Sequence, residues 1–405
     1  MLAAGTVVWV ISRGAFRLLR GTSFEMLRGA ATGQLFPRGF SQAAPAHRKS
    51  DAEAEEQCCQ AGDHGVFGCR GRNACSNGVA EVGEIAPLVI PDNFPPPRLH
   101  PQAWKISPVM TRLRADLLLL ACAAVWGFAF LCQKRAMEHV GPFAFVAIRS
   151  VLACFALAPL VVRECRRMKA AKGCLPLTEL FRVGGAAGVA FFAAAALQQT
   201  GLVTASVTNC GFLTALYVVI TPFLAWLMVG QKPGPWIWVA AVLSFLGTWL
   251  LGGGSLAMLS RGDWLVAASA SLWALHVVIT GVGARLDMVA TFTAFQFVVV
   301  ALLAGITASF SESLSLTAMV KAAPDLLYVG ILSSAVTFSM LAVALRATRA
   351  AEATVILSTE SLFAALVAYL FLGERLQAIG WFGAGTIFLA TLVVQMPGRS
   401  AVAKE

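Results

Sequence analysis

Ten stretches of helix length, each almost entirely apolar, follow one another between residue 116 and the C-terminus. Residues 183–231, for example, contain no charged side chain. A membrane-spanning helix needs about 20 mainly apolar residues to cross roughly 30 Å of hydrocarbon. Inside lipid the backbone must satisfy its own hydrogen bonds, so segments of this length must be helical. The sequence therefore predicts an all-α membrane protein with ten transmembrane helices.

Composition supports this interpretation and argues against a nucleic-acid partner. Hydrophobic residues make up 58% of the chain and charged residues 13%, whereas soluble domains carry about 25% charged residues. Residues 110–405 hold 20 Lys/Arg and 12 Asp/Glu, which accounts for +8 of the net charge of +10. Because this excess gathers in the loops of one side, it indicates membrane orientation. The ten cysteines show no CxxC spacing, so no metal site is predicted.

Residues 1–109 differ in character from the rest. Residues 1–50 contain seven basic residues and one acid, which is typical of an organelle transit peptide. Alternatively, Met110 opens the string MTRLRADLLLL, which is typical of a transporter start, and the upstream part follows from a mis-assigned start. A folded soluble domain is the third alternative. We expect a disordered extension at 1–109, a first five-helix repeat at 110–254 and a second at 255–405.

Basic residues in the expected loops predict the orientation. If the N-terminus is cytoplasmic, the inside loops carry 14 Lys/Arg and the outside loops carry 5. Both termini are therefore expected in the cytoplasm, although Lys134 and Arg135 in the first outside loop oppose the rule. The expected spans are 116–134, 141–162, 183–202, 206–229, 235–253, 264–283, 288–309, 325–345, 352–373 and 377–397.

The two halves of this region resemble each other. Residues 125–127 (Val-Trp-Gly) match 272–274 (Leu-Trp-Ala) at an offset of 147, and 147–149 match 294–296 at the same offset. Residues 227–232 match 370–375 at an offset of 143, so one short gap is needed. Since five spans per repeat is an odd number, equivalent helices must cross the membrane in opposite directions. Inverted repeats of this kind place a substrate site near the midplane, between the halves.

Four strings carry a resemblance to a known family: VWGFAF, PFAFVAIR, FLTALYVVITPFLAWLMVGQKP and STESLFAALVAYLFLGERL. They resemble the EamA-type transporters of the drug/metabolite transporter superfamily, over about 116–397. The resemblance implies ten spans, cytoplasmic termini and transport of small metabolites, often export. The family's Glu-Pro in helix nine is here Glu360-Ser361, so the proline that would kink this helix is missing.

Two charged residues are placed well inside the expected spans. Arg149 lies about eight residues into the second span and Glu360 about eight residues into the ninth, each roughly 12 Å deep. A charge at such a depth costs about 2.5–3.5 kcal/mol on insertion scales, so both should face the bundle interior. We interpret Arg149 as an anchor for an anionic group and Glu360 as a proton-coupling or cation-binding group. The alternative for both is a structural role in hydrogen bonding between helices.

Other polar and aromatic residues in the spans are candidates for substrate binding. Trp126 and Trp273 occupy repeat-related positions and could form stacking walls, although core packing is the simpler explanation. His276 lies one turn after Trp273 and has no second metal ligand nearby in sequence, which favours a packing role. The remaining candidates are uncharged residues that could orient a substrate: Asn209, Tyr217 and Gln296.

The leading prediction is a secondary transporter, an exporter of small organic metabolites that works by alternating access. One alternative is an organellar nucleotide-sugar or phosphate-ester carrier, favoured if 1–109 is a targeting sequence. Another is a membrane-embedded enzyme or scaffold, although the HExxH, GxSxG and P-loop motifs are missing. The expected partners are a small-molecule substrate, optionally with a proton, the lipid bilayer and optionally a second copy of the chain as a homodimer. No cofactor and no nucleic acid are predicted. The expected location is the plasma (inner) membrane, with an organellar membrane as the alternative.

Overall fold

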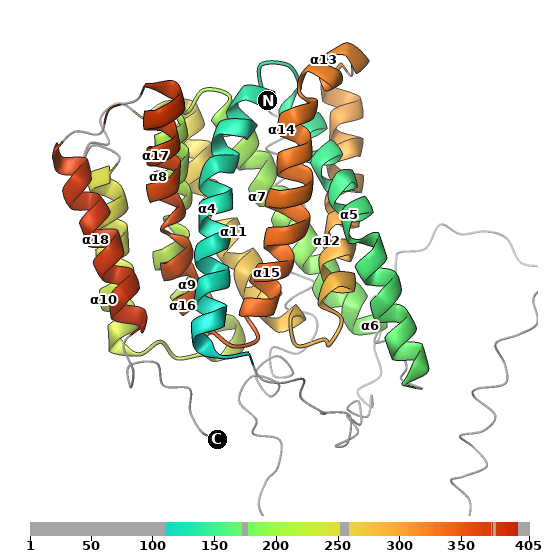
Figure 1. Cartoon of the computed structure of the whole chain (residues 1–405), viewed down its shortest axis with the longest axis horizontal. Helices are drawn as coiled ribbons and strands as arrows, with labels where there is room; N and C mark the ends of the chain where they lie inside the picture. Colours follow the sequence, from blue (N-terminus) through green and yellow to red (C-terminus); the bar gives the residue numbers. More distant parts are fainter. Residues whose placement is uncertain are drawn as a thin grey trace, which may run out of the picture. The chain divides into compact units, whose positions relative to one another are not determined.

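The computed structural model describes residues 110–171, 177–251, 259–313, 315–373, 375 and 378–395, and this part of the chain contains helices and no strands (Figure 1). The expected all-α membrane architecture is confirmed. The interpretations made for residues 1–109 fall outside the described residues.

Five apolar spans make up each half. The helices of the first half are α4 (Arg112–Ala136), α5 (Pro142–Ala170), α6 (Leu177–Glu179), the π-helix η1 (Leu180–Gly184), α7 (Gly185–Leu202), α8 (Val207–Thr214), α9 (Tyr217–Val229) and α10 (Pro235–Leu251). Those of the second half are α11 (Arg261–Gly283), α12 (Val289–Ser311), α13 (Leu316–Lys321), α14 (Ala323–Leu327), the π-helix η2 (Tyr328–Val336), α15 (Thr337–Ala344), α16 (Ala350–Leu357), α17 (Glu360–Leu372) and α18 (Ala378–Gln395). Within the described residues, nine continuous or joined helices are long and apolar enough to cross a membrane, and α10 is a shorter apolar helix.

The fourth and ninth spans are broken at equivalent places. The first break separates α8 from α9 at residues 215–216, and the second separates α16 from α17 at residues 358–359, 143 residues later. Both spans end at a glycine in the left-handed conformation, Gly230 (φ 69°) and Gly373 (φ 68°), again 143 residues apart. A residue with a Cβ atom is strained at such a C-terminal cap, which explains the glycine at both positions. The backbone thus repeats at the offset found in the sequence.

The ninth span breaks without a proline. Instead, hydroxyl side chains bond backwards to carbonyl oxygens three residues earlier: Ser358 Oγ to Val355 at 2.6 Å and Thr359 Oγ1 to Ile356 at 2.7 Å. Back-bonding of this kind weakens and bends helices. The span is therefore broken here even though the family's proline is replaced by Ser361.

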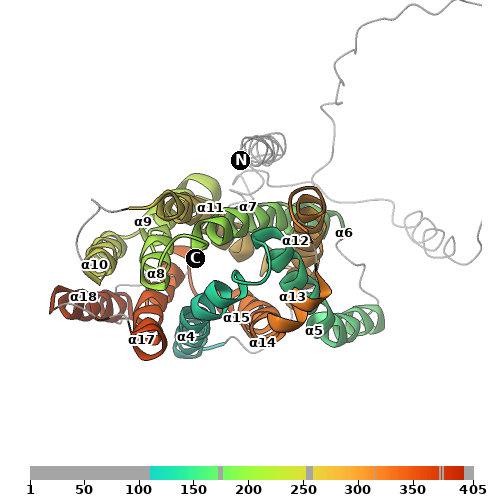
Figure 2. The same ribbon diagram turned by 90° about the horizontal axis from the view of Figure 1, so that it is seen from above.

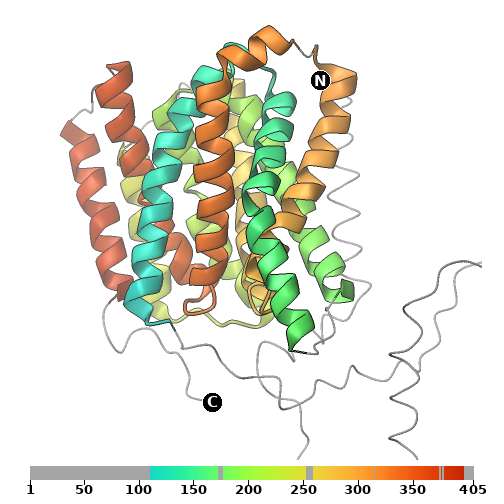
Figure 3. The same ribbon diagram turned by 45° about the vertical axis from the view of Figure 1, so that its right-hand side comes forward.

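The two halves pack through equivalent pairs of helices. Viewed from above, α4 lies beside α17 and the α14–α15 span, and α11 lies beside α7 and α9 (Figure 2). The second and seventh spans, α5 and α12, pack against each other (Figure 3). The helices α10 and α18 also pack against each other (Figure 2). Each of these contacts therefore recurs between the equivalent helices when the first and second halves are interchanged, as expected for an inverted repeat.

Reciprocal carboxylate caps join α5 and α12. Glu312, just after α12, accepts hydrogen bonds from the backbone N–H groups of Phe143 and Ala144 at the start of α5 (2.9 and 2.8 Å). Glu164, near the end of α5, accepts from the N–H groups of Ala290 and Thr291 at the start of α12 (3.0 and 2.8 Å). A carboxylate is favourable there because the first N–H groups of a helix lack intrahelical partners and carry partial positive charge.

Lys134 and Arg135, the two basic residues that oppose the expected orientation, are both compensated. The Lys134 ammonium donates to the carbonyl oxygens of Leu202, Val203 and Ala205 at 2.8–3.0 Å, where α7 ends. Arg135 forms an ion pair with Asp325 at 3.6 Å. These partners explain why two cations are tolerated at that end of α4.

Candidate functional site

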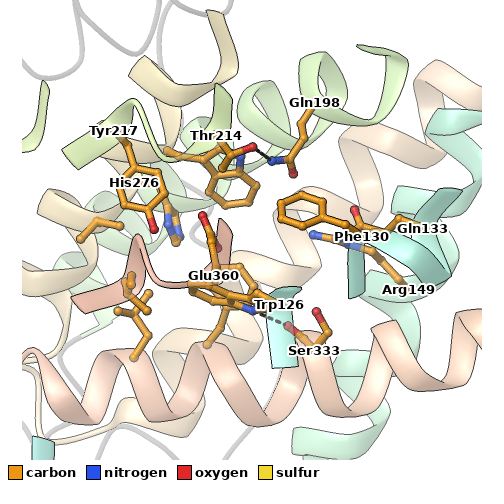
Figure 4. A pocket seen from close by; sticks show the side chains of 15 residues that line it. Trp126, Phe130, Gln133, Arg149, Gln198, Thr214, Tyr217, His276, Ser333 and Glu360 are labelled. Carbon is orange, nitrogen blue, oxygen red and sulfur yellow. Dashed lines mark hydrogen bonds between the residues drawn. The ribbon is translucent and has the colours of Figure 1, made fainter. Parts of the chain in front are cut away.

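A cavity with an empty volume of about 540 Å³, including the part open to solvent, lies within the bundle (Figure 4). The side chains that line it come from both halves: Trp126, Phe130, Gln133, Arg149, Gln198, Thr214, Tyr217, Trp273, His276, Val277, Ser333, Phe338, Leu341, Leu357 and Glu360. Six of the eight candidates from the sequence are among them.

Arg149 and Glu360 line different parts of the cavity. Arg149 extends from α5 and Glu360 from the first turn of α17, and Figure 4 shows the two side chains apart from each other. Their relative exposures are 4% and 2%. No ion pair among the described residues involves either charge. The Arg149 guanidinium carbon lies 5.4 Å from the centroid of the Phe191 ring, which gives the cation a π face but no counter-charge.

Several polar atoms at the cavity have no hydrogen-bond partner in the described structure. They include Arg149 Nε and Gln133 Oε1, whereas the side chains of Tyr217 and Glu360 interact with each other. Tyr217 and Glu360 occupy equivalent positions, since each is the first residue after the break in its span. Buried polar groups are normally paired with protein or water, so these atoms are available for hydrogen bonds to a bound solute or to water.

Aromatic rings form a symmetrical wall. Trp126 packs on Phe338 with ring centroids 5.0 Å apart, and Trp273 packs on Phe191 at 5.1 Å. The two pairs are equivalent under the internal repeat. Trp126 and Trp273 are 147 residues apart, and so are Phe191 and Phe338. Trp126 is also anchored through Nε1, which donates to Thr337 Oγ1 at 2.7 Å.

His276 reaches the cavity, whereas Gln296 stands behind it. His276 Nε2 lies 2.7 Å from Gln296 Oε1, and its ring packs among Phe191, Trp273 and Phe338. The Gln296 side chain is completely buried but does not line the cavity. It therefore orients the imidazole from behind.

Asn209 also lies outside the cavity lining. Its side-chain amide donates to Asp263 Oδ1 at 3.2 Å, near the ends of α8 and α11 that lie away from the cavity. Other cavity residues carry amides and hydroxyls and were not predicted from the sequence, such as Gln133, Gln198 and Thr214. A signal for Gln133 and Gln198 was available, because amide side chains are uncommon in lipid-facing parts of spans.

This geometry suits reversible binding of a small polar solute. The cavity offers a guanidinium, a separate carboxylate beside a phenol and an imidazole, and two indole rings. Within the described residues, no group of three or more His, Cys, Asp and Glu side chains could hold a metal ion. These side chains can recognise a solute through charge, hydrogen bonds and ring stacking.

Comparison with known proteins gives consistent matches. The EamA-like transporter family matches residues 113–253 and 260–396, one copy in each half. An "uncharacterized transporter" of Archaeoglobus fulgidus is 28% identical over 288 residues, which cover 70% of this chain and 87% of the relative. The "uncharacterized transporter YwfM" of Bacillus subtilis is 25% identical over 293 residues, covering 72% and 96%. A solved crystal structure matches with a TM-score of 0.55 at 15% identity, over 70% of this chain and 97% of that one, which supports the fold.

Proposed function

Because the chain belongs to the EamA-like transporter family, we propose that this integral membrane protein is a secondary transporter that exports small organic metabolites by alternating access. The cavity between the inverted repeats is the proposed substrate site. Export is inferred from the resemblance to the family, whose members often carry metabolites outward.

One observation carries the proposal: Arg149 and Glu360 are buried at the cavity without opposite charges. A buried charge is costly unless it is paired, so a fixed pair would be expected if the two residues served only packing. Unpaired groups on different sides of a cavity instead suit a solute that brings its own polar ends. We propose that Arg149 binds an anionic group, while Glu360, with Tyr217 beside it, binds a cationic group or carries a proton. Trp126 and Trp273 form the stacking walls.

The proposed location is the plasma (inner) membrane, with both termini in the cytoplasm. This orientation is supported by the basic residues in the last turns of α5, Arg163, Arg166, Arg167 and Lys169, together with Lys232 between α9 and α10. The end of the bundle where α4 begins, the lower end in Figure 1, is then cytoplasmic.

An organellar phosphate-ester carrier has less support from the cavity. Arg149 is the one lysine or arginine among the described residues that line it. A doubly charged phosphate is usually held by several cationic or N–H donors.

Metabolite profiling tests the proposal. Cells that express the protein and cells that express an unrelated membrane protein at the same level are compared, in both medium and cell extract. We expect one or a few small polar metabolites to accumulate in the medium and to fall in the cells. Vesicles with purified protein should then move the same compounds. Identical profiles, together with no uptake by vesicles of any candidate compound, would contradict transport.

A further inference from the structure

A buried charge cluster joins the two halves at the end where α4 begins. Arg112 Nε donates to Asp116 Oδ1 at 2.8 Å, and its Nη1 bonds Glu352 Oε2 on α16. Thr348 Oγ1 also donates to Glu352, at 3.3 Å. Asp116 and Glu352 are only 6% and 2% exposed. We call Arg112, Asp116 and Glu352 the inner latch.

A simpler contact joins the halves at the opposite end. The Asn209 amide of α8 donates to Asp263 Oδ1 of α11 at 3.2 Å. The other oxygen of Asp263 accepts from the N–H and hydroxyl groups of Ser260 (2.8 and 2.7 Å), which caps α11. We call Asn209 and Asp263 the outer latch.

The latches are equivalent under the internal repeat. Asp116 and Asp263 are 147 residues apart, the offset that also relates Trp126 to Trp273. Asn209 and Glu352 are 143 residues apart, the offset of the two helix breaks. The inner latch therefore joins the first span to the ninth, and the outer latch joins the sixth to the fourth. The chemistry differs, since one has three charges and the other has one charge and an amide.

Both latches lie beyond the cavity along the same helices. Glu352 precedes Glu360 by eight residues and Asp116 precedes Trp126 by ten, which corresponds to about 12–15 Å at the helical rise. Asp263 precedes Trp273 by the same ten residues. Each latch thus holds together the helix ends that must separate if solute is to pass between the cavity and that side.

We propose that the inner and outer latches are the two gates of the transport cycle, an inference that rests on the proposed function. Opening the inner gate separates Arg112 from Glu352, and the freed charges become hydrated. The inner latch joins the halves by an ion pair, whereas the outer latch joins them by a hydrogen bond from a neutral amide to a carboxylate, without the attraction between two opposite charges. The cytoplasmic gate is therefore the firmer one, and a substrate arriving from the cytoplasm must offset its opening.

Thiol labelling tests the gates without knowledge of the substrate. Leu357 lines the cavity between Glu352 and Glu360, so Leu357→Cys is placed in a full-length chain whose ten native cysteines are replaced. A membrane-impermeant maleimide is applied to vesicles of each orientation. With Arg112→Ala we expect about tenfold faster labelling from the cytoplasmic face, which corresponds to about 1.4 kcal/mol, and slower labelling from the other face.

Three further variants test the assignment of the gates. The charge swap Arg112→Glu with Glu352→Arg should restore slow cytoplasmic labelling, because the ion pair is rebuilt. Asn209→Ala, the matched change in the outer latch, should speed labelling from the external face instead. The isosteric Glu352→Gln replaces Arg112→Ala if the latter does not fold.

Unchanged labelling in the Arg112 and Glu352 variants would overturn the proposal. An equal rise from both faces would also overturn it, because it indicates a loosened bundle. If the labelling responds as expected but vesicles move no metabolite, the gates stand and the proposed function fails.

Discussion

The rings of Phe191 and Phe338 stack on each other, with centroids 4.7 Å apart and planes inclined by 21°. The two residues occupy the same position in the two repeats, 147 residues apart. Only residues next to a two-fold axis can contact their own equivalents. This stack therefore marks where the pseudo-two-fold axis passes, directly beside the cavity that Phe338 helps to line.

The stack should stabilise the contact between the halves. We expect Phe191→Ala to lower the stability of the detergent-solubilised protein by about 3 kcal/mol, because a large aromatic side chain is lost from a packed interior. The same change at Phe338 should cost a similar amount. The double variant should lose about 1 kcal/mol less than the sum, which is the pair energy of stacked rings.

Thermal unfolding followed by size-exclusion chromatography measures these changes. Phe388→Ala on α18 is the control, because that ring is 61% exposed on the outside of the bundle and should change stability little. Strict additivity of the two core substitutions would show that the stack contributes no energy of its own.

The reciprocal caps on α5 and α12 give a second prediction. Glu312→Gln should lower stability by about 1–2 kcal/mol, since the amide offers one acceptor where two N–H groups need partners, and the favourable charge is lost. Glu164→Gln should cost as much at the opposite end. Glu179→Gln is the matched control, because Glu179 belongs to an exposed pair with Arg182. Equal melting temperatures for all three variants would contradict the capping role.

The spans and the repeat could be predicted from sequence because they depend on local composition and on matches at a fixed offset. Arg149 and Glu360 could also be found, since a charge within an apolar run is conspicuous. The same offset of 147 relates Phe191 to Phe338. Their stacking could not be predicted, however, because two phenylalanines in apolar helices do not indicate that their rings are in contact.

The inner latch could not be found in this way. Arg112 and Glu352 are 240 residues apart, and each lies at the edge of its span, where charges are common. Their pairing depends on which helices become neighbours. The break at residues 358–359 was hidden for another reason, because the proline that would have indicated it is absent from this span.

The orientation is tested by a C-terminal reporter that is active only in the cytoplasm. We expect activity, because the predicted inside loops carry 14 basic residues and the outside loops 5. The same reporter inserted in the loop between α12 and α13 should be silent. An inactive C-terminal fusion with an active loop fusion would mean that the bundle sits in the membrane the other way round.

Arg149→Gln should weaken binding of the transported metabolite by about 10- to 100-fold, as expected for loss of a charge-assisted hydrogen bond of about 1.5–3 kcal/mol. Arg149→Lys should retain part of the affinity, because the charge remains. Concentration-dependent uptake into vesicles, normalised to folded protein, measures both. Arg182→Gln, at an exposed arginine outside the cavity lining, is the control and should behave like the native protein. Native uptake kinetics in Arg149→Gln would remove this residue from the site.

Glu360→Gln should abolish the pH dependence of transport while leaving expression intact. The carboxyl group can exchange a proton with the cavity, whereas the amide has nearly the same shape and is fixed in a neutral form. Uptake at two pH values therefore should differ for the native protein and coincide for the variant. Glu138→Gln, at an exposed glutamate between α4 and α5, should keep the native difference. A purely structural Glu360 predicts the opposite pattern: poor folding of the variant, with a native pH response in whatever protein survives. That outcome would be compatible with the fold but would show that a residue outside the ninth span couples transport to protons.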